Sequence, residues 1–200
     1  MSQQIVIVNT GCANISSVKF AVERLGVRVQ VSDDLAIIKR ADKVFLPGVG
    51  SANAAMASIE HKNLVNCIQG LQQPVLGICL GMQLMVEKSA ESLNGSTPCL
   101  NLIPGEVKRM QVGDLRLPHM GWNTVTPLDN TSLFKGIPAA TYFYFVHSFA
   151  VALSEFTLAS CQYGMDFSAA LHKDNFFGVQ FHPERSSDAG AQLLKNFIEL

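Results

Sequence analysis

Val75-Leu-Gly-Ile-Cys-Leu-Gly-Met-Gln83 is the stretch of sequence that decides the fold. Its apolar start, residues 75–78, is typical of a buried strand, and a helix is expected from residue 81 to about 88. Cys79 therefore stands where a strand turns directly into a helix, with Gly77 and Gly81 two residues away on either side. This is the cysteine counterpart of the Gly-x-Ser-x-Gly turn that exposes a nucleophile at the edge of an α/β sheet.

The sequence before this stretch alternates between short apolar runs and helical spacing. Strands are expected at residues 5–8, 27–31 and 43–46. A helix capped by Ser16 or Ser17 is expected after the first strand, and Asp33 or Asp34 should open a second helix at 35–40. Further helices are expected at 52–60 and 64–71. This alternation predicts an α/β fold with a doubly wound, mostly parallel mixed sheet flanked by helices.

The second half of the chain changes character. Residues 92–150 hold prolines, turns and short strand-like runs at 107–110, 123–126 and 141–146, which we expect to form a peripheral antiparallel sheet. Later strands are expected at 156–162, 167–171 and 176–181, and a closing helix from about residue 189. Because neither an internal repeat nor a linker is apparent, residues 1–200 are expected to form a single domain.

The composition excludes several classes of function. Charged residues make up 16% of the chain, below the usual level of about 25%, which slightly favours a face covered by a partner. A formal net charge of −1 argues against a nucleic-acid or anionic membrane surface. No apolar run approaches the roughly 18 residues that span a bilayer, and Met1-Ser-Gln-Gln-Ile5 lacks a basic leader. We therefore expect a cytoplasmic protein.

The cysteines point to reactive chemistry at no more than one or two positions. They are odd in number and include no Cys-x-x-Cys pair, so neither disulfides nor a zinc site is expected. We accordingly expect no metal and no cofactor. Most should be small buried residues, and alone the Cys79 pattern fits a structural cysteine about as well as a nucleophile. The five are Cys12, Cys67, Cys79, Cys99 and Cys161.

Phe176-Phe-Gly-Val-Gln-Phe-His-Pro-Glu184 supplies the base that a nucleophilic Cys79 needs. Here a strand runs directly into His182. Ligand sites of open α/β sheets lie at the carboxyl ends of the strands, so His182 and Cys79 are expected at one edge. Glu184 can accept a hydrogen bond from one imidazole nitrogen and leave the other for the thiol.

His147 gives a rival pairing with Cys79, because the run Tyr144-Phe-Val-His-Ser148 also ends a strand. Of these two histidines, only His182 has a carboxylate as a close neighbour in sequence, which favours it as the base. The remaining histidines are expected at the surface or satisfied in the core. They are His61, His119 and His172.

With these residues placed, the chain resembles the class-I, triad-type glutamine amidotransferases over nearly its whole length. Pro47-Gly-Val-Gly50, Gly77-Ile-Cys-Leu-Gly-Met-Gln83 and His182-Pro-Glu184 occur in the family's order and spacing. It is most similar to the branch that provides the glutaminase subunit of imidazole glycerol phosphate synthases, in histidine biosynthesis. This subtype rests on Asn14-Ile-Ser-Ser-Val18, Pro47-Gly-Val-Gly50, Pro118-His-Met-Gly-Trp-Asn123 and Tyr144-Phe-Val-His-Ser148.

The resemblance implies roles for further residues around Cys79, His182 and Glu184. Backbone N–H groups of Leu80 and of Val49 or Gly50 would stabilise the oxyanion. The glycines beside Val49 would let this peptide turn its N–H into place when a partner is loaded. Glutamine would be bound by Gly48, Gln83, Ser148 and Phe149.

The resemblance also implies a partner, a (β/α)₈ cyclase subunit that forms a heterodimer with this chain and receives its ammonia. Aromatic residues, Met and Arg are enriched at interfaces, and the expected contacts are Asn14, Met120, Trp122 and Arg185. Three alternatives stay open: a glutaminase for another acceptor such as pyridoxal phosphate synthase, a non-catalytic ligand-binding relative, and a γ-glutamyl peptide hydrolase.

Overall fold

Strands and helices alternate along the chain in the computed structural model, which describes residues 3–11, 14–92, 95–128 and 131–200. The elements of the first half are β1 (Ile5–Val8), α1 (Ile15–Glu23), β2 (Val29–Ser32), α2 (Leu35–Arg40), β3 (Lys43–Gly48), α3 (Ala52–His61), α4 (Val65–Gln69), β4 (Val75–Cys79), α5 (Leu80–Gln83), β5 (Lys88–Ser89) and β6 (Thr97–Pro98). Those of the second half are β7 (Glu106–Arg109), β8 (His119–Pro127), η1 (Ser132–Phe134), β9 (Thr141–His147), β10 (Phe149–Val151), β11 (Thr157–Gln162), β12 (Asp166–Lys173), β13 (Phe176–Val179), η2 (Pro183–Arg185) and α6 (Ser187–Ile198).

Helix starts follow the capping chemistry only in part. The Asp34 side chain accepts hydrogen bonds from the backbone N–H groups of Ala36 and Ile37, which opens α2 as predicted. The predicted cap of α1 is wrong, because this helix already begins at Ile15 and both Ser16 and Ser17 lie inside its first turn. Asn14, at the cap position, makes no side-chain hydrogen bond to the helix.

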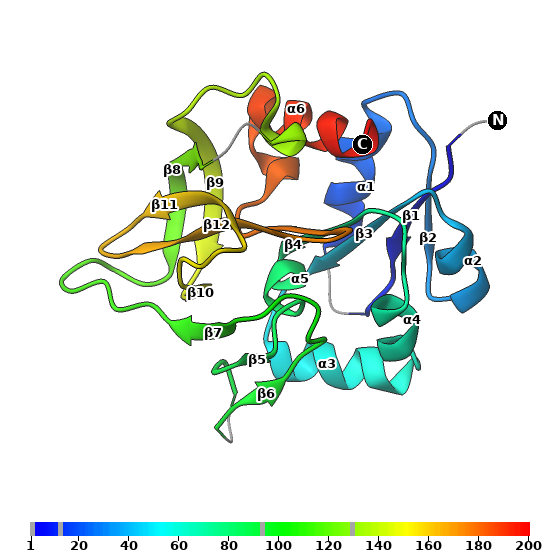
Figure 1. Cartoon of the computed structure of the whole chain (residues 1–200), viewed down its shortest axis with the longest axis horizontal. Coiled ribbons are helices and arrows are strands. Elements are labelled where there is room, and N and C mark those ends of the chain that lie inside the picture. Colours follow the sequence, from blue (N-terminus) through cyan, green and yellow to red (C-terminus); the bar gives the residue numbers. More distant parts are fainter. Residues whose placement is uncertain (1–2, 12–13, 93–94, 129–130) are drawn as a thin grey trace.

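The main sheet has nine strands in the order β2-β1-β3-β4-β13-β12-β11-β8-β9. The strands from β2 to β13 are parallel, and those from β12 onward continue the sheet in antiparallel fashion. Figure 1 shows α1 and α6 over one face and α3 and α4 over the other. The predicted doubly wound, mixed sheet is confirmed.

The inner parallel strands divide their side chains between two hydrophobic clusters, since successive residues of a strand point to opposite faces. Ile5 and Ile7 of β1 belong to the cluster under α1 and α6, together with buried residues of both helices. Val6 and Val8 belong to the opposite cluster, with buried residues of α2, α3 and α4. Burial on both faces explains why these strands appear in the sequence as continuous apolar runs.

The structure confirms a second, small sheet but corrects which of the predicted strands belong to it. Runs 123–126 and 141–146 belong to β8 and β9, which join the main sheet instead of a separate one. The reason is that Phe143 and Phe145 of β9 are fully buried and contact Phe181 of the main core. The second sheet, in the order β10-β7-β5-β6, is small and mixed, because β5 and β7 are parallel.

Helix α5 is much shorter than the predicted helix at 81–88. It ends at Gln83. The following residues 84–86 form a turn, are fully buried and bond to residues 100–103 through their main chain. The backbone carbonyls of Leu84 and Met85 accept hydrogen bonds from the N–H groups of Leu100 and Leu102. These bonds replace the intrahelical ones that a longer helix would form.

The turn from β4 into α5 leaves no room for side chains at its two glycines. A Cβ atom on Gly81 would lie 1.7 Å from the carbonyl oxygen of Leu46 in β3. A Cβ atom on Gly77 would lie 2.8 Å from the backbone of Gly81. Glycine at both positions is therefore what allows α5 to begin directly at the end of β4.

Replacing Gly81 with Ala should lower the free energy of unfolding by roughly 3 kcal/mol, because the new methyl group collides with main chain that cannot move aside. Urea unfolding measures the change. The control is Gly70→Ala, where the nearest atom lies 3.2 Å from the new Cβ and the expected loss is below about 1 kcal/mol. Equal losses in the two variants would contradict this explanation of the turn.

Candidate active site

Three segments that are distant in sequence meet at the carboxyl end of the parallel strands. β4 pairs on one side with β3, where Gly48 is opposite Cys79, and on the other with β13, where Val179 is opposite Ile78. Residues 47–50, the turn at Cys79 and residues 180–184 therefore lie side by side, as expected for ligand sites in open α/β sheets.

A cavity of about 460 Å³ opens at this edge of the sheet. It gathers nearly all residues predicted for the site, except Gly48, Met120 and Trp122. Gly48 instead packs against the turn, since a Cβ atom there would lie 2.9 Å from the Gly81 nitrogen. The lining residues are Asn14, Val49, Gly50, Cys79, Leu80, Gln83, Glu91, Arg109, Pro118, Val146, His147, Ser148, Phe149, His182, Glu184 and Arg185.

Cys79 has a strained backbone. Its φ is +53° and its ψ is −110°, a conformation that a residue with a side chain seldom adopts. Such strain persists only where the surrounding structure imposes it, and it is concentrated at functional sites. Here the strained turn places Cys79 in the cavity wall, directly before the first residue of α5.

His182 is held by its main chain and by a carboxylate. Its Nδ1 lies 2.7 Å from Oε1 of Glu184, and both side chains are buried. Its N–H donates to the Tyr144 carbonyl at 2.9 Å, and its carbonyl accepts from the Ser186 hydroxyl at 2.7 Å. The buried Nε2 has no hydrogen-bond partner of good geometry within the described residues, which leaves it available to the Cys79 thiol.

The electrostatic environment of His182 favours its protonated form. Burial alone would lower the pKa of His182, but its interactions with Cys79 and then Glu184 outweigh burial and raise the pKa to about 10. The imidazolium is the partner that a cysteine thiolate requires. This combination is typical of cysteine nucleophiles paired with histidine.

His147 is not available as a rival base. Its Nδ1 donates to the Phe149 carbonyl at 2.8 Å, and its Nε2 lies 3.0 Å from Nδ1 of His119. Burial lowers the pKa of His147 to about 3, so the ring is neutral. Both of its nitrogens are thus engaged in the protein interior, and the structure brings His182 to Cys79 instead.

The other described cysteines lack such an environment. Burial raises the pKa of Cys67, that of Cys99 to about 11 and that of Cys161 to about 12. They stay thiols at neutral pH, which suits small residues of the core. Cys12 lies outside the described residues.

Three polar residues of the site were not predicted from the sequence: Glu91, Arg109 and Gln180. Gln180 is fully buried and donates from Nε2 to Cys79 Sγ at 3.8 Å. A signal for Gln180 was present, because it is a polar residue in the apolar run 176–181 and lies two residues before His182. In a strand this spacing places both side chains on the same face. Glu91 and Arg109 come from the small second sheet and its loops, which gave no such signal.

The predicted partner contacts form an exposed surface next to the cavity. Met120 and Trp122 of β8 are 66% and 52% exposed. The Trp122 ring meets the Tyr144 ring of β9 edge-on, and the Arg185 guanidinium lies 5.7 Å from the centre of that same ring. With Asn14 and Arg185 in the cavity wall, this aromatic surface is continuous with the site.

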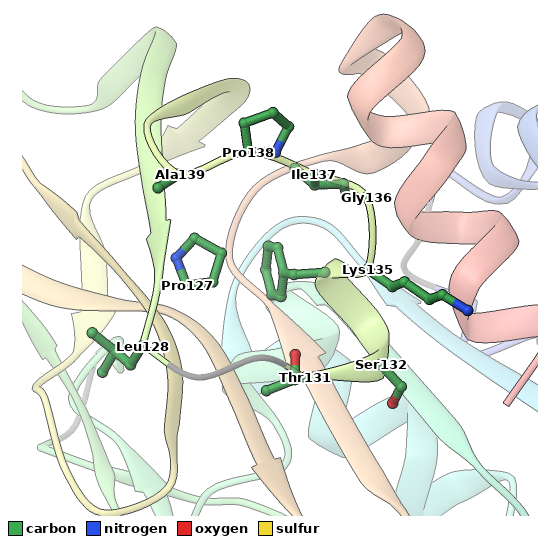
Figure 2. A pocket seen from close by; sticks show the side chains of 10 residues that line it. Pro127, Leu128, Thr131, Ser132, Lys135, Gly136, Ile137, Pro138 and Ala139 are labelled. Atoms are coloured by element: carbon green, nitrogen blue, oxygen red, sulfur yellow. The ribbon is translucent and has the colours of Figure 1, made fainter.

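A larger cavity, of about 990 Å³, is not near Cys79. Figure 2 shows it between the end of β8 and the loop that carries Thr131, Lys135 and Pro138. Among the described residues that line it, Lys135 is the one titratable side chain. Within the described ranges, no cluster of three or more His, Cys, Asp or Glu side chains could hold a metal ion. None of the described helices has the length and apolar character needed to cross a membrane.

Comparison with known proteins gives consistent results. The class-I glutamine amidotransferase family matches residues 6–200. The chain is 58% identical to the imidazole glycerol phosphate synthase subunit HisH of Colwellia psychrerythraea, over 98% of this chain and 92% of that protein. It is 53% identical to the HisH subunit of Vibrio cholerae, over 100% of both.

Solved structures share the fold at lower identity. PurLQS from Thermotoga maritima aligns with a TM-score of 0.74 at 16% identity, over 100% of this chain and 99% of that chain. A glutamine amidotransferase aligns with a TM-score of 0.73 at 16% identity, over 97% of each chain. These likenesses confirm the predicted architecture.

The imidazole of His182 should titrate above its ordinary range, and two substitutions should lower its pKa. Glu184→Gln keeps an oxygen near Nδ1 but removes the negative charge, and Cys79→Ala removes the sulfur. NMR titration of the ring measures the shift, with the signal assigned from a His182→Asn variant. A titration that both substitutions leave unchanged would contradict this account of the site.

Proposed function

The chain belongs to the class-I glutamine amidotransferases, and we propose from this that it is the glutaminase subunit of an imidazole glycerol phosphate synthase. It hydrolyses glutamine to glutamate and ammonia and passes the ammonia to a cyclase subunit. The observation that carries the proposal is Cys79, held at a strained turn beside an imidazole that Glu184 orients. The HisH relatives, similar over nearly the whole chain, favour this acceptor over the alternatives.

The first half of the reaction forms a covalent intermediate. The Cys79 thiolate attacks the carboxamide carbon of glutamine, and the oxygen of that group becomes an oxyanion. Backbone N–H groups of Leu80 and of Val49 or Gly50 stabilise it, and one such donor contributes about 3–4 kcal/mol. The protonated ring of His182 gives its proton to the carboxamide nitrogen, and the C–N bond breaks. Ammonia is released, and a γ-glutamyl thioester remains on Cys79.

The second half consumes water. Once Cys79 is a thioester its negative charge is gone, so a cause of the raised pKa of His182 disappears and the neutral ring can act as a base. His182 takes a proton from water as the oxygen attacks the thioester carbon. The C–S bond then breaks, glutamate leaves, and the thiolate and imidazolium are restored. Glu184 keeps the ring oriented throughout.

The glycines around Val49 let the oxyanion site depend on a partner. Gly50 has φ +93°, and Val49 is 41% exposed, so its peptide is not fixed by packing. We propose that the loaded cyclase turns an N–H of this segment toward the oxyanion. Glutamine itself is bound beside it by Gly48, Gln83, Ser148 and Phe149.

The exposed aromatic surface is the proposed docking site for the cyclase, a (β/α)₈ barrel that forms a heterodimer with this chain. Asn14, Met120, Trp122 and Arg185 contact it, and ammonia passes between the two sites. The complex makes imidazole glycerol phosphate and aminoimidazole carboxamide ribotide in histidine biosynthesis. We propose that residues 1–200 act as one amidotransferase domain, in the cytoplasm and without a cofactor of their own.

Ammonia release from glutamine tests the proposed function. The isolated chain should be slow, and the cyclase subunit with its nucleotide substrate should accelerate it. Cys79→Ala should reduce release in the complex by roughly 10³-fold or more, because no nucleophile remains. Activity that survives this substitution would exclude the mechanism, and full activity without the partner would exclude the gating.

Binding to the cyclase tests the docking surface. Trp122→Ala should weaken the complex by about 2 kcal/mol, or about 30-fold in Kd, since buried aromatic side chains dominate interface energies. Leu200→Ala is the matched control. Leu200 is also exposed, but it lies near the start of β3, at the amino end of the parallel strands and away from the cavity. Calorimetry measures both, and equal Kd values for Trp122→Ala and the wild type would place the interface elsewhere.

A further inference from the structure

Three polar groups form a chain of hydrogen bonds that reaches Cys79 in the protein interior. Nε2 of Gln180 donates to Cys79 Sγ at 3.8 Å, and Oε1 of Gln180 accepts from Nε2 of Gln83 at 2.9 Å. Nε2 of Gln83 also donates to the main-chain carbonyl of Phe149 at 2.9 Å. Gln180 is 0% exposed and Gln83 is 4% exposed. These bonds are therefore shielded from water.

The same carbonyl of Phe149 joins a second set of bonds that reaches β8. Nδ1 of His147 donates to it at 2.8 Å, and Nε2 of His147 lies 3.0 Å from Nδ1 of His119. Nε2 of His119 lies 3.1 Å from Nδ2 of Asn123, which also donates to the Gln162 carbonyl at 2.9 Å. Both imidazoles are buried.

Carbonyl oxygens fix the direction of every bond in this network, because they only accept. Phe149 requires N–H groups from His147 and Gln83, so Nε2 of His147 must accept from the Nδ1–H of His119. Nε2 of His119 then accepts from Asn123. Burial lowers the pKa of His119 to about 4 and that of His147 to about 3, in agreement with two neutral rings.

The network leaves one end of the Gln83 amide free. Both N–H groups of Gln83 are used, by Phe149 and by Gln180. Its Oε1 accepts no hydrogen bond within the described residues, yet it is not among their fully buried unpaired atoms, and Gln83 lines the cavity. What Gln83 offers a ligand is therefore an acceptor. An ammonium group, which has three donors and no acceptor, matches it, whereas a carboxylate does not.

We propose that Gln180, His147 and His119 are positioning residues that lock the Gln83 amide with its oxygen toward the α-ammonium group of glutamine. This inference rests on the proposed function, since it takes glutamine as the ligand. The Phe149 carbonyl selects this orientation, Gln180 accepts the second N–H of Gln83, and His147 holds the carbonyl in place. Loss of Gln180 or His147 weakens this selection, and the Gln83 amide can turn over. The orientation with NH₂ toward the cavity would then repel the ammonium group.

The test compares two reagents that alkylate Cys79 in the assembled complex. One is 6-diazo-5-oxo-norleucine, which carries the α-ammonium and α-carboxylate groups of glutamine, and the other is chloroacetamide, which carries neither. The ratio of their second-order labelling rates, measured by mass spectrometry, cancels changes in the reactivity of Cys79 itself. Gln180→Leu should lower the ratio about tenfold, the size expected for a lost hydrogen bond to a charged group.

Two further variants make the result specific. Gln180→Glu keeps an acceptor for Gln83 and should hold the ratio within about twofold of the wild type. His147→Phe removes the donor to Phe149 in a pocket already lined by Phe145 and Phe167, and should lower the ratio severalfold. This variant also keeps the test decisive if Gln180→Leu does not fold.

The outcomes separate this inference from the proposed function. A ratio that neither Gln180→Leu nor His147→Phe lowers would overturn the positioning role. An equal loss of labelling by both reagents would overturn it too. Such a loss leaves the ratio unchanged and reports only on the reactivity of Cys79 or on a general structural defect. If the wild-type complex instead releases no ammonia from glutamine, the proposed function itself fails.

Discussion

The close approach of Gly81 to the Leu46 carbonyl is the contact on which the site depends. Because no side chain separates α5 from β3, the helix begins directly at the end of β4, and Cys79 takes up its positive φ. The same contact keeps residues 46–48 against the turn, whereas a Cβ atom on Gly50 would meet nothing within 4 Å. One steric constraint in the main chain thus positions Cys79, and the proposed oxyanion peptide beyond Gly48 stays free to turn.

The buried histidines of this region differ in charge for a structural reason: the protonated form is favoured for His182 and the neutral form for His147 and His119. His182 faces the Glu184 carboxylate, whereas His147 and His119 face a carbonyl and an amide. A carboxylate stabilises the imidazolium in the interior, and neutral partners do not. In the proposed mechanism His182 exchanges protons while His147 and His119 stay neutral, so proton transfer and substrate positioning belong to separate groups.

The sequence predicted well what local patterns determine, and less well what tertiary contacts determine. The parallel strands and α2 lie where apolar runs and the Asp34 cap indicated. The strand-to-helix turn at Cys79 and the strand that leads into His182 together predicted that both residues lie at the carboxyl ends of the parallel strands. Helix α5 was predicted too long because residues 84–86 bond to distant residues 100–103. Gln180 carries a local signal as a polar residue in an apolar run, but its side-chain partners Cys79 and Gln83 belong to two other elements, which no local pattern reveals.

Tyr144 of β9 contacts two different parts of the molecule, one through its main chain and one through its ring. Its Tyr144 carbonyl accepts the N–H of His182, while its Tyr144 ring lies between Trp122 and Arg185 on the exposed surface. The main chain of Tyr144 thus supports the candidate active site, and its ring is part of the surface proposed for docking. Under the proposed docking, substitutions on this outer surface would lose activity in a genetic screen just as active-site substitutions do, although they contact no catalytic atom. Exposure is therefore a poor guide to mutational tolerance in this part of the molecule.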